Sequence, residues 1–234
     1  MDKVGYETGA AAVGESVVEL TSAQQRQLVL ALAASLAQHG APPRHIETHI
    51  SHVLLHAGHA YKIKKALATS FLDQSTLARR RHACVEELRL NRRLAPQLYL
   101  DVVAITGTIE QPVLGGEGPA LEVAVKMRAF DEDGLWDRLA ARGALRAADV
   151  DDLAAVLAPF HAEAAVATPN GWLGAPVQVR QTLLDSLRDL QSAAADAPWP
   201  DVVARAALDR LRGWEAEASA RLPPVMARRL AERR

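Results

Sequence analysis

Three lysines stand within four positions in the segment GHAYKIKKAL, which spans residues 58–67. Successive side chains of a β-strand point to opposite faces, so a strand here would place Ala60, Lys62 and Lys64 on one side and Lys65 on the other. A slim side chain beside a cation suits a nucleotide pocket, because the base packs on the small residue and the ammonium group binds phosphates. A solvated edge strand shows the same pattern, and Lys64 and Lys65 are interpreted as surface charges.

The composition is typical of a globular protein of the cytoplasm. Apolar residues make up 49% of the 234 residues and charged residues 24%, and the formal net charge of −1 favours neither nucleic acid nor an anionic membrane. The low aromatic content of 4% also weakens any function based on stacking of nucleic-acid bases. A single cysteine, Cys84, excludes an internal disulfide and fits a reducing compartment. We expect a cytoplasmic protein without membrane partners, since the sequence has neither an apolar run of about 18 residues nor a secretion signal.

The predicted elements begin with a helix and three short strands, after a Gly- and Ala-rich segment at 1–20 that is predicted to be a loose leader. The segment TSAQQRQLVLALAASLAQHG is predicted as a helix with Thr21 or Ser22 as its N-cap and Gly40 beyond its end. Gly58 is interpreted as the turn between the second and third strands. The three predicted strands are RHIETHIS (44–51), HVLLHAG (52–58) and HAYKIKK (59–65).

A longer helix and two further strands follow. The segment STLARRRHACVEELRLNRRLA is predicted as a helix over about 75–95. Cys84 lies in the apolar stripe of this helix and is interpreted as a core residue, and Glu87 lies at the margin of the stripe. The two strands are predicted at 99–107 and 120–130, and a loop rich in glycine and proline joins them.

The character of the chain changes near residue 131, after which the sequence is rich in alanine and leucine. Helices are predicted at 133–142, 147–165, 176–194, 200–219 and 223–234. We therefore predict three parts: the leader at 1–20, a sheet-containing lobe with its leading helix at 21–131, and a helical lobe at 132–234.

Helix, three strands, helix, two strands and then helices is the element order of a protein-kinase small lobe followed by the start of the large lobe. Protein kinases carry V-A-I-K on their third strand, and its lysine pairs with nucleotide phosphates and with a glutamate of the following helix. The tripeptide Ala-Tyr-Lys that ends at Lys62 has the same spacing, and Glu87 lies on the next predicted helix. A carboxylate there would hold the flexible ammonium group, so that phosphate binding costs less side-chain entropy. VAVK at 123–126 matches the motif better by spelling but falls where the fifth strand enters the hinge, so Lys62 is preferred.

Several segments together resemble the aminoglycoside-phosphotransferase-like domain of bacterial proteins described as bifunctional phosphotransferase/ATP-binding proteins. The matching segments are IETHIS, AYKIKK, FLDQSTLARRR, EELRLNRRLAPQLYLDVVAITGT and AVKMRAF, within residues 44–165. The resemblance implies an α+β, protein-kinase-like fold, with a small lobe of a five-stranded antiparallel sheet plus helix and a partial, all-helical large lobe. It also implies ATP as phosphate donor, magnesium, an unidentified small-molecule acceptor and a P-loop ATPase domain as a partner.

The resemblance further implies which residues bind ATP. Lys62 would bind the phosphates and Glu87 would orient it, while the segment from Met127 to Phe130 would form the strand and hinge beside the adenine. The loop between the first two strands has no glycine, unlike the Gly-rich loop of protein kinases, so hydroxyl groups and backbone amides are left to bind phosphates there. The predicted nucleotide-binding residues are Ala60, Lys62, Glu87, Met127, Thr48 and Ser51.

The residues that carry catalysis in this family have no counterpart in the sequence. The family's catalytic loop reads approximately His-Gly-Asp-Leu-His, and neither this string nor a P-loop motif occurs. A kinase needs one carboxylate to accept the hydroxyl proton and another to hold the metal, so no catalytic residue and no metal ligand is predicted. We interpret the chain as the ATP-binding part of a phosphotransferase, truncated before its catalytic loop and inactive alone. The alternative is a non-catalytic, pseudokinase-like regulatory or docking module for a P-loop ATPase partner.

Two other groups of residues permit different chemistry. Five histidines fall within residues 45–59, but no cysteine or carboxylate completes a zinc spacing, so they are interpreted as exposed strand residues without a metal. The arginines within residues 79–93 would give a helix a basic face able to bind nucleic acid. The balanced net charge favours a solvated helix face instead, and a nucleic-acid partner is not expected.

Overall fold

The computed structural model describes residues 19–166, 172, 174–196 and 201–232. The chain divides into two compact units, residues 1–138 and 139–234. The change of composition predicted near residue 131 lies shortly before this division, which falls within helix α3, Trp136–Ala141. Of the predicted leader, residues 1–18 lie outside the described residues.

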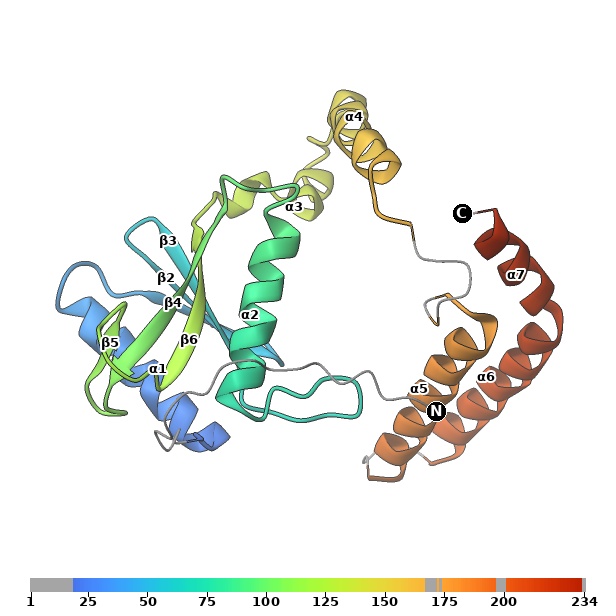
Figure 1. Cartoon of the computed structure of the whole chain (residues 1–234), viewed down its shortest axis with the longest axis horizontal. Helices are drawn as coiled ribbons and strands as arrows, with labels where there is room; N and C mark the ends of the chain where they lie inside the picture. Colours follow the sequence, from blue (N-terminus) through green and yellow to red (C-terminus); the bar gives the residue numbers. More distant parts are fainter. Residues whose placement is uncertain (1–18, 167–171, 173, 197–200, 233–234) are drawn as a thin grey trace. The chain divides into compact units, whose positions relative to one another are not determined.

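The first unit contains a six-stranded antiparallel sheet with helices, and the protein is therefore of the α+β class (Figure 1). The strand order across the sheet is β1-β2-β3-β6-β4-β5. The five predicted strands are present, and the sixth, β5, lies in the segment predicted as a loop. The strands are β1 Arg44–Glu47, β2 Ser51–His56, β3 His59–Lys64, β4 Tyr99–Gly107, β5 Pro112–Leu114 and β6 Glu122–Arg128.

Two tight turns explain the differences between predicted and observed strands. Gly107 has a φ of +87°, and a Cβ atom there would lie 2.4 Å from the carbonyl oxygen of Gln111, so glycine lets β4 fold back into β5. The predicted first strand at 44–51 is interrupted by a turn at Thr48. The Thr48 amide donates to the Ser51 carbonyl oxygen at 2.9 Å, and the Thr48 hydroxyl accepts from the Ser51 amide at 3.0 Å. Ser51 therefore starts β2 instead of ending β1.

Helix α1, Ser22–Ala37, covers one face of the sheet. Thr21 is its N-cap: the Thr21 hydroxyl accepts from the Gln24 amide at 3.2 Å, and the Gln24 side chain accepts from the Thr21 amide at 3.0 Å. These reciprocal bonds satisfy two of the backbone donors that a helix start leaves open. The apolar side of α1 packs on the sheet in a cluster whose fully buried members are Leu28, Val29, Leu32, Leu54, Ile63, Ile105 and Ala124.

The end of the predicted leader belongs to this unit. Leu20 is buried in the cluster formed by α1 and the sheet. The Glu19 carboxylate accepts a hydrogen bond of 2.7 Å from the backbone amide of Leu77, which starts the next helix. The predicted leader therefore does not extend to these two residues.

Helix α2, Leu77–Asn91, lies beside β6 and covers the opposite face of the sheet (Figure 1). Thr76 is its N-cap, and the helix is shorter than the predicted range of 75–95 at both ends. A second buried cluster consists of Leu77, Cys84, Val123 and Val125. The two valines flank Ala124, which belongs to the cluster of α1, and neighbours along a strand point to opposite faces. The sheet therefore lies between the two helices.

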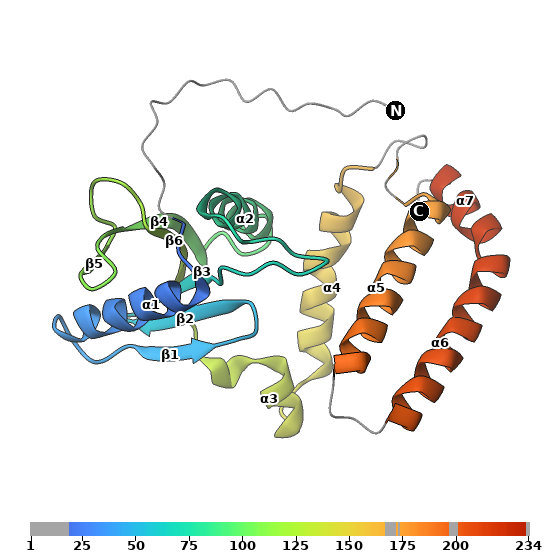
Figure 2. The same ribbon diagram turned by 90° about the horizontal axis from the view of Figure 1, so that it is seen from below.

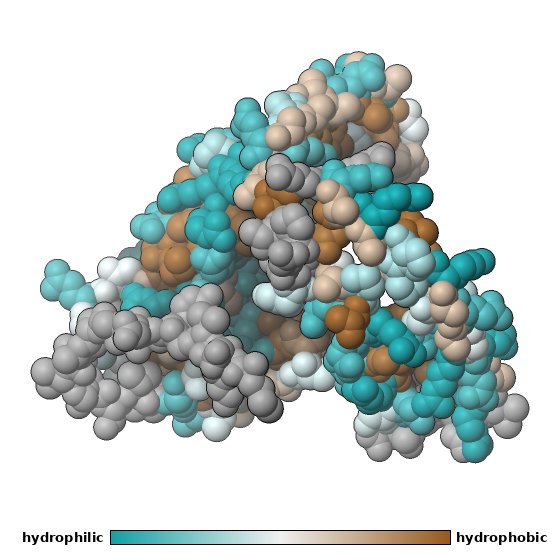
Figure 3. Space-filling model, turned by 45° about the vertical axis from the view of Figure 1, so that its right-hand side comes forward, coloured by the Kyte–Doolittle hydropathy of each residue, from teal (hydrophilic) through white to brown (hydrophobic). Residues whose placement is uncertain are grey.

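The second unit is helical in its described part, as predicted. Its helices are α4 Ala147–Ala162, α5 Pro176–Asp196, α6 Asp201–Arg221 and α7 Pro223–Ala231. Helices α5, α6 and α7 pack on one another (Figure 2) and line a groove of about 470 Å³ whose walls include Val177, Leu183, Trp214 and Met226. Apolar residues are visible at the molecular surface among hydrophilic ones (Figure 3), and Val177 and Trp214 are exposed. No helix in the described ranges is long and apolar enough to cross a membrane.

Candidate functional site

The turn between β2 and β3 determines which lysines face α2. Ala57 and Gly58 both have positive φ angles, +47° and +74°, as the two central residues of a type I′ hairpin turn require. The predicted turn at Gly58 is therefore confirmed. The pairing that follows sets the register of β3, with Lys62 and Lys64 on the face that α2 covers. A register shift of one residue would turn both lysines to the other face.

Lys62 and Lys64 both form ion pairs with Glu87 of α2. The Nζ atom of Lys62 lies 2.9 Å from Oε1 of Glu87, and the Nζ atom of Lys64 lies 2.6 Å from Oε2. The side chain of Lys62 is 29% exposed, whereas those of Lys64 and Glu87 are only 11% and 12% exposed. The structure thus brings the predicted pair of Lys62 and Glu87 together. The interpretation of Lys64 as a surface charge is wrong, because its ammonium group lies inside the cluster.

The electrostatics of this cluster favour an anionic ligand. Burial acts to raise the pKa of Glu87, but hydrogen bonds from the Lys64 and Lys62 ammonium groups outweigh it and hold that pKa below its ordinary value of 4.5. The carboxylate is therefore ionised at neutral pH. Two ammonium groups against one carboxylate leave one positive charge in excess, in a place where water screens charges less than at an open surface.

The same cluster does not suit magnesium, the metal ion that the family resemblance implies. Magnesium binds through carboxylates and water in a near-ideal octahedron. Both oxygens of Glu87 already accept hydrogen bonds from ammonium groups. The ammonium groups of Lys62 and Lys64 have no lone pair and cannot add ligands for a metal ion. The residues beside Lys62 therefore do not fit this ion.

The two predicted hydroxyl groups differ in their hydrogen bonding. Ser51 lies directly opposite Lys64 in the pairing of β2 and β3 and is buried. Its Oγ atom has no hydrogen-bond partner among the described residues, so it retains the capacity to bond with a ligand or a water molecule. The Thr48 hydroxyl donates to the Ser51 carbonyl oxygen at 3.1 Å and therefore has no donor left for a phosphate. Thr48 shapes the turn, and Ser51 remains a candidate ligand residue.

Ala60 and Met127 provide a small apolar surface beside the lysines. They lie opposite each other on β3 and β6, and Lys62 pairs two positions further along with Val125. Ala60 is buried, and Met127 is half-buried against the cluster of α2. Phe130, at the far end of the predicted hinge, lies beyond β6 and is exposed. The structure therefore joins Ala60 and Met127 to the face of Lys62, and it leaves Phe130 outside the sheet.

Arg80 of α2 is a buried charge that the sequence interpretation missed. Its Nε atom donates to both oxygens of Glu122, at 3.0 and 2.9 Å, and both side chains are fully buried. Gln25 of α1 donates to the same carboxylate at 2.6 Å, so the network links both helices to β6. Burial raises the pKa of Glu122, and the hydrogen bonds from Arg80 and Gln25 oppose that rise. Helical spacing could have indicated that Arg80 is buried, because it lies four residues before the buried Cys84 and therefore on the same face of the helix.

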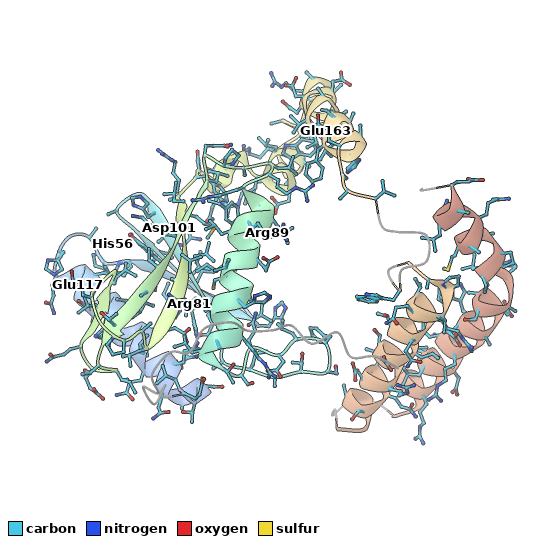
Figure 4. All side chains as sticks on the ribbon, in the orientation of Figure 1. His56, Arg81, Arg89, Asp101, Glu117 and Glu163 are labelled. Atoms are coloured by element: carbon cyan, nitrogen blue, oxygen red, sulfur yellow. The ribbon has the colours of Figure 1, made fainter. Side chains whose placement is uncertain are left out.

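The other arginines of α2 do not form one basic face. Arg79 pairs with Asp73, and Arg89 pairs with Glu86 at 2.7 Å. Arg81 and Arg89 are exposed, and both are labelled in Figure 4. Because acidic neighbours neutralise two of these arginines and Arg80 is buried, the helix offers a weaker nucleic-acid surface than its sequence suggests.

Three side chains of ligand type meet on the opposite face of the sheet. Ligand atoms of His45, Glu47 and His52 all lie within 4.8 Å of one another. His52 is only 3% exposed, so the interpretation of the strand histidines as exposed is wrong for this residue. Burial lowers the pKa of His52 to about 4, and its imidazole is neutral near pH 7. The carboxylate that the sequence interpretation lacked is Glu47, which pairs with His52 across β1 and β2.

Cys84 is confirmed as a core residue. Its side chain is fully buried between α2 and β6. Burial raises the pKa of its thiol to about 12, so the nucleophilic thiolate does not form near neutral pH.

Comparison with known proteins identifies relatives in two mycobacterial species. The chain is 36% identical over 118 residues to uncharacterized proteins of Mycobacterium tuberculosis and Mycobacterium bovis. The aligned stretch makes up 50% of this chain but 22% of each relative, so the chain spans about a fifth of the length of these curated relatives. No family model matches the chain. No solved structure matches it either.

Proposed function

We propose that the sheet-containing unit binds ATP as a kinase-like small lobe and forms the ATP-binding part of an aminoglycoside-phosphotransferase-like protein, whose acceptor is an unidentified small molecule. The observation that carries this proposal is the ion pair of 2.9 Å between Lys62 on β3 and Glu87 on α2. Protein kinases hold nucleotide phosphates with a lysine of the third strand that is paired with a glutamate of the next helix. The excess positive charge of the cluster supports the same function.

Lys62 and Lys64 take different roles in this proposal. Lys62 is the more exposed of the two, so its ammonium group is the one that a phosphate reaches. Lys64 stays with Glu87 at 2.6 Å. An ammonium group has three N–H donors, so Lys62 can donate to a phosphate while Glu87 still orients it. Lys64 pairs with the other oxygen of Glu87 and helps to keep this carboxylate ionised in a half-buried place.

The remaining members of the proposed site surround this lysine. Ala60 and Met127 would pack against the flat face of the adenine ring, a contact between apolar surfaces that needs no hydrogen bond. Ser51 would donate its unused hydroxyl to a phosphate oxygen, directly or through water. Thr48 leaves the proposed set, because its donor closes the turn. The proposal is limited to nucleotide binding, since neither a catalytic base nor a magnesium ligand has been assigned.

Nucleotide affinity tests this proposal directly. ATP is titrated calorimetrically into the 234-residue chain and into its Lys62→Ala and Lys65→Ala variants, with and without Mg²⁺. Lys65 is the matched control, because it directly follows β3 and pairs with Glu47 on the other face. Loss of a charge-assisted phosphate contact should weaken binding by Lys62→Ala at least about tenfold, or about 1.4 kcal/mol, while Lys65→Ala stays within about twofold. Equal affinities of wild type and Lys62→Ala, or no binding by either, would contradict the proposal.

A pseudokinase-like docking module is the second candidate function, with a P-loop ATPase domain as the partner that the resemblance implies. The apolar groove between α5, α6 and α7 favours it, because exposed apolar surfaces of this kind mark protein contacts. Trp214, at the groove, is an exposed side chain of the type that dominates interface energies. Phosphoryl transfer by this purified chain that Lys62→Ala abolishes would exclude a purely docking role.

A further inference from the structure

Three side chains of the β1–β2 hairpin converge on the face of the sheet that α1 covers. His45 and Glu47 are two residues apart on β1 and therefore point to the same side. His52 lies directly opposite Glu47 on β2, so a cross-strand contact completes the group. Neutral imidazole nitrogens and a carboxylate are ligands that zinc and related divalent metals accept.

The two imidazole rings already have a separation close to that of metal ligands. The Nε2 atom of His45 lies 3.1 Å from the Nδ1 atom of His52. Around a tetrahedral zinc ion with Zn–N bonds of about 2.0–2.1 Å, two nitrogens lie about 3.3–3.4 Å apart. A metal ion therefore has to replace the hydrogen bond between the two rings, and it requires only a small increase in the distance between these nitrogens.

The surroundings of Glu47 act on such an ion in two ways. Lys65 donates to Oε1 at 2.8 Å, and Arg26 donates to both oxygens at 3.0 and 2.9 Å. Metal-ligating carboxylates are commonly held by hydrogen bonds of this kind, which orient them. The same cations repel a dication, and Lys65 does so more strongly because its side chain is more buried than that of Arg26.

We propose that His45, Glu47 and His52 form a binding site for a divalent transition metal ion of the zinc, cobalt, nickel and copper class. Three protein ligands leave at least one coordination position for water or a small ligand. Glu47 and His52 both line a pocket of about 350 Å³ next to the first turn of α1. The site lies on the face of the sheet opposite Lys62, and it does not depend on the proposed nucleotide function.

Metal titration of the full chain tests the site. Zn²⁺ is titrated calorimetrically into protein freed of metal with a chelator, and Co²⁺ is followed by its visible absorption, which reports the coordination number. We expect one ion per chain and a cobalt spectrum of four- or five-fold coordination. His45→Ala should weaken Zn²⁺ binding at least about tenfold, since even substitutions outside the ligand set cost that much. His56→Ala is the control, because His56 lies on β2 (Figure 4) and its ring contacts the Ala41 carbonyl oxygen at 3.2 Å.

Two further variants keep the test decisive. Glu47→Gln alters an exposed ligand, so it should fold even where a histidine variant does not, and it should weaken Zn²⁺ binding like His45→Ala. Lys65→Met should instead tighten Zn²⁺ binding several-fold, because it removes both a competing partner of Glu47 and a repelling charge. The proposal is overturned if the wild type binds no Zn²⁺, if His56→Ala weakens binding as much as His45→Ala, or if Lys65→Met weakens it.

Discussion

Two clusters of the same charge composition lie on opposite faces of the sheet. Glu87 pairs with Lys62 and Lys64 on the face of α2, and Glu47 pairs with Lys65 and Arg26 on the face of α1. The Glu87 side chain is 12% exposed, whereas that of Glu47 is 33% exposed. Because water screens the second cluster more, the same three charges produce a stronger positive potential around Glu87.

The neighbours of the two carboxylates differ as much as their burial. Glu87 lies over a face with a buried hydroxyl, that of Ser51, and a small apolar surface, which suits a phosphate-bearing ligand. Glu47 lies beside the imidazoles of His45 and His52, which suit a transition metal. The two proposed ligands therefore differ because of the groups packed around the charges, and not because of the charge composition.

The largest effect is expected where α2 is anchored to the sheet. Arg80→Met leaves the fully buried Glu122 carboxylate without its cation, which should destabilise the first unit by about 3–5 kcal/mol. Arg80 holds the helix that carries Glu87, so this variant should also expose the Glu87 cluster to solvent. The clusters on the two faces of the sheet would then have similar exposure. Hydrogen exchange of the amides of β3 and β6 measures the loss of stability as a loss of protection. Arg79→Met, at an exposed neighbouring position, is the control. Equal losses of protection in both variants would disprove that Arg80 anchors α2 to the sheet.

An intermediate effect is expected from neutralising each carboxylate in turn. Glu87→Gln leaves two ammonium groups facing each other in a half-buried place, and it should reduce the free energy of unfolding by about 1–3 kcal/mol. Glu47→Gln should have a smaller effect, because solvent reaches its cations. Urea unfolding of both isosteric variants measures the difference. A larger loss for Glu47→Gln than for Glu87→Gln would reverse our comparison of the two faces.

The pH dependence of stability should show a gradual effect that is small at each step, because one proton contributes at most about 1.4 kcal/mol per pH unit. The pKa of His52 falls from 6.5 to about 4 on folding, so the unfolded chain binds a proton first and stability drops as the pH falls through this window. The pKa of Glu87 is lowered below 4.5, so its contribution is present above pH 4.5 and is lost as the pH falls through the folded-state value.

Variants separate these two windows. In the presence of a chelator, His52→Gln should reduce the dependence of the melting temperature on pH between pH 6.5 and about 4. Glu87→Gln should reduce this dependence only below pH 4.5. Melting temperatures of the wild type and of both variants, measured across this pH range, show the two changes. A His52→Gln profile that keeps the wild-type slope between pH 6.5 and 4 would mean that His52 is not buried as a neutral ring.

The order and type of the elements could be predicted from local patterns. Helix α1 has a capping box at Thr21, and the β2–β3 turn has Gly58 at a positive φ, both of which are properties of a few adjacent residues. The sixth strand could not be predicted, because β5 has three residues and pairs only after Gly107 reverses the chain. The likeness of this α+β unit to a kinase small lobe stays a proposal.

The sequence by itself determined that Lys62 and Lys64 share a face and that Glu87 lies at the edge of the next helix's buried side, because alternation and helical spacing are local. Only the tertiary structure decided that Lys64 is buried, that Arg80 points inward to Glu122, and that Glu47 meets His52. Each of these contacts joins elements whose packing depends on residues far apart in the chain. Burial and strand pairing, which set the strength of every charge here, arise only when those elements come together.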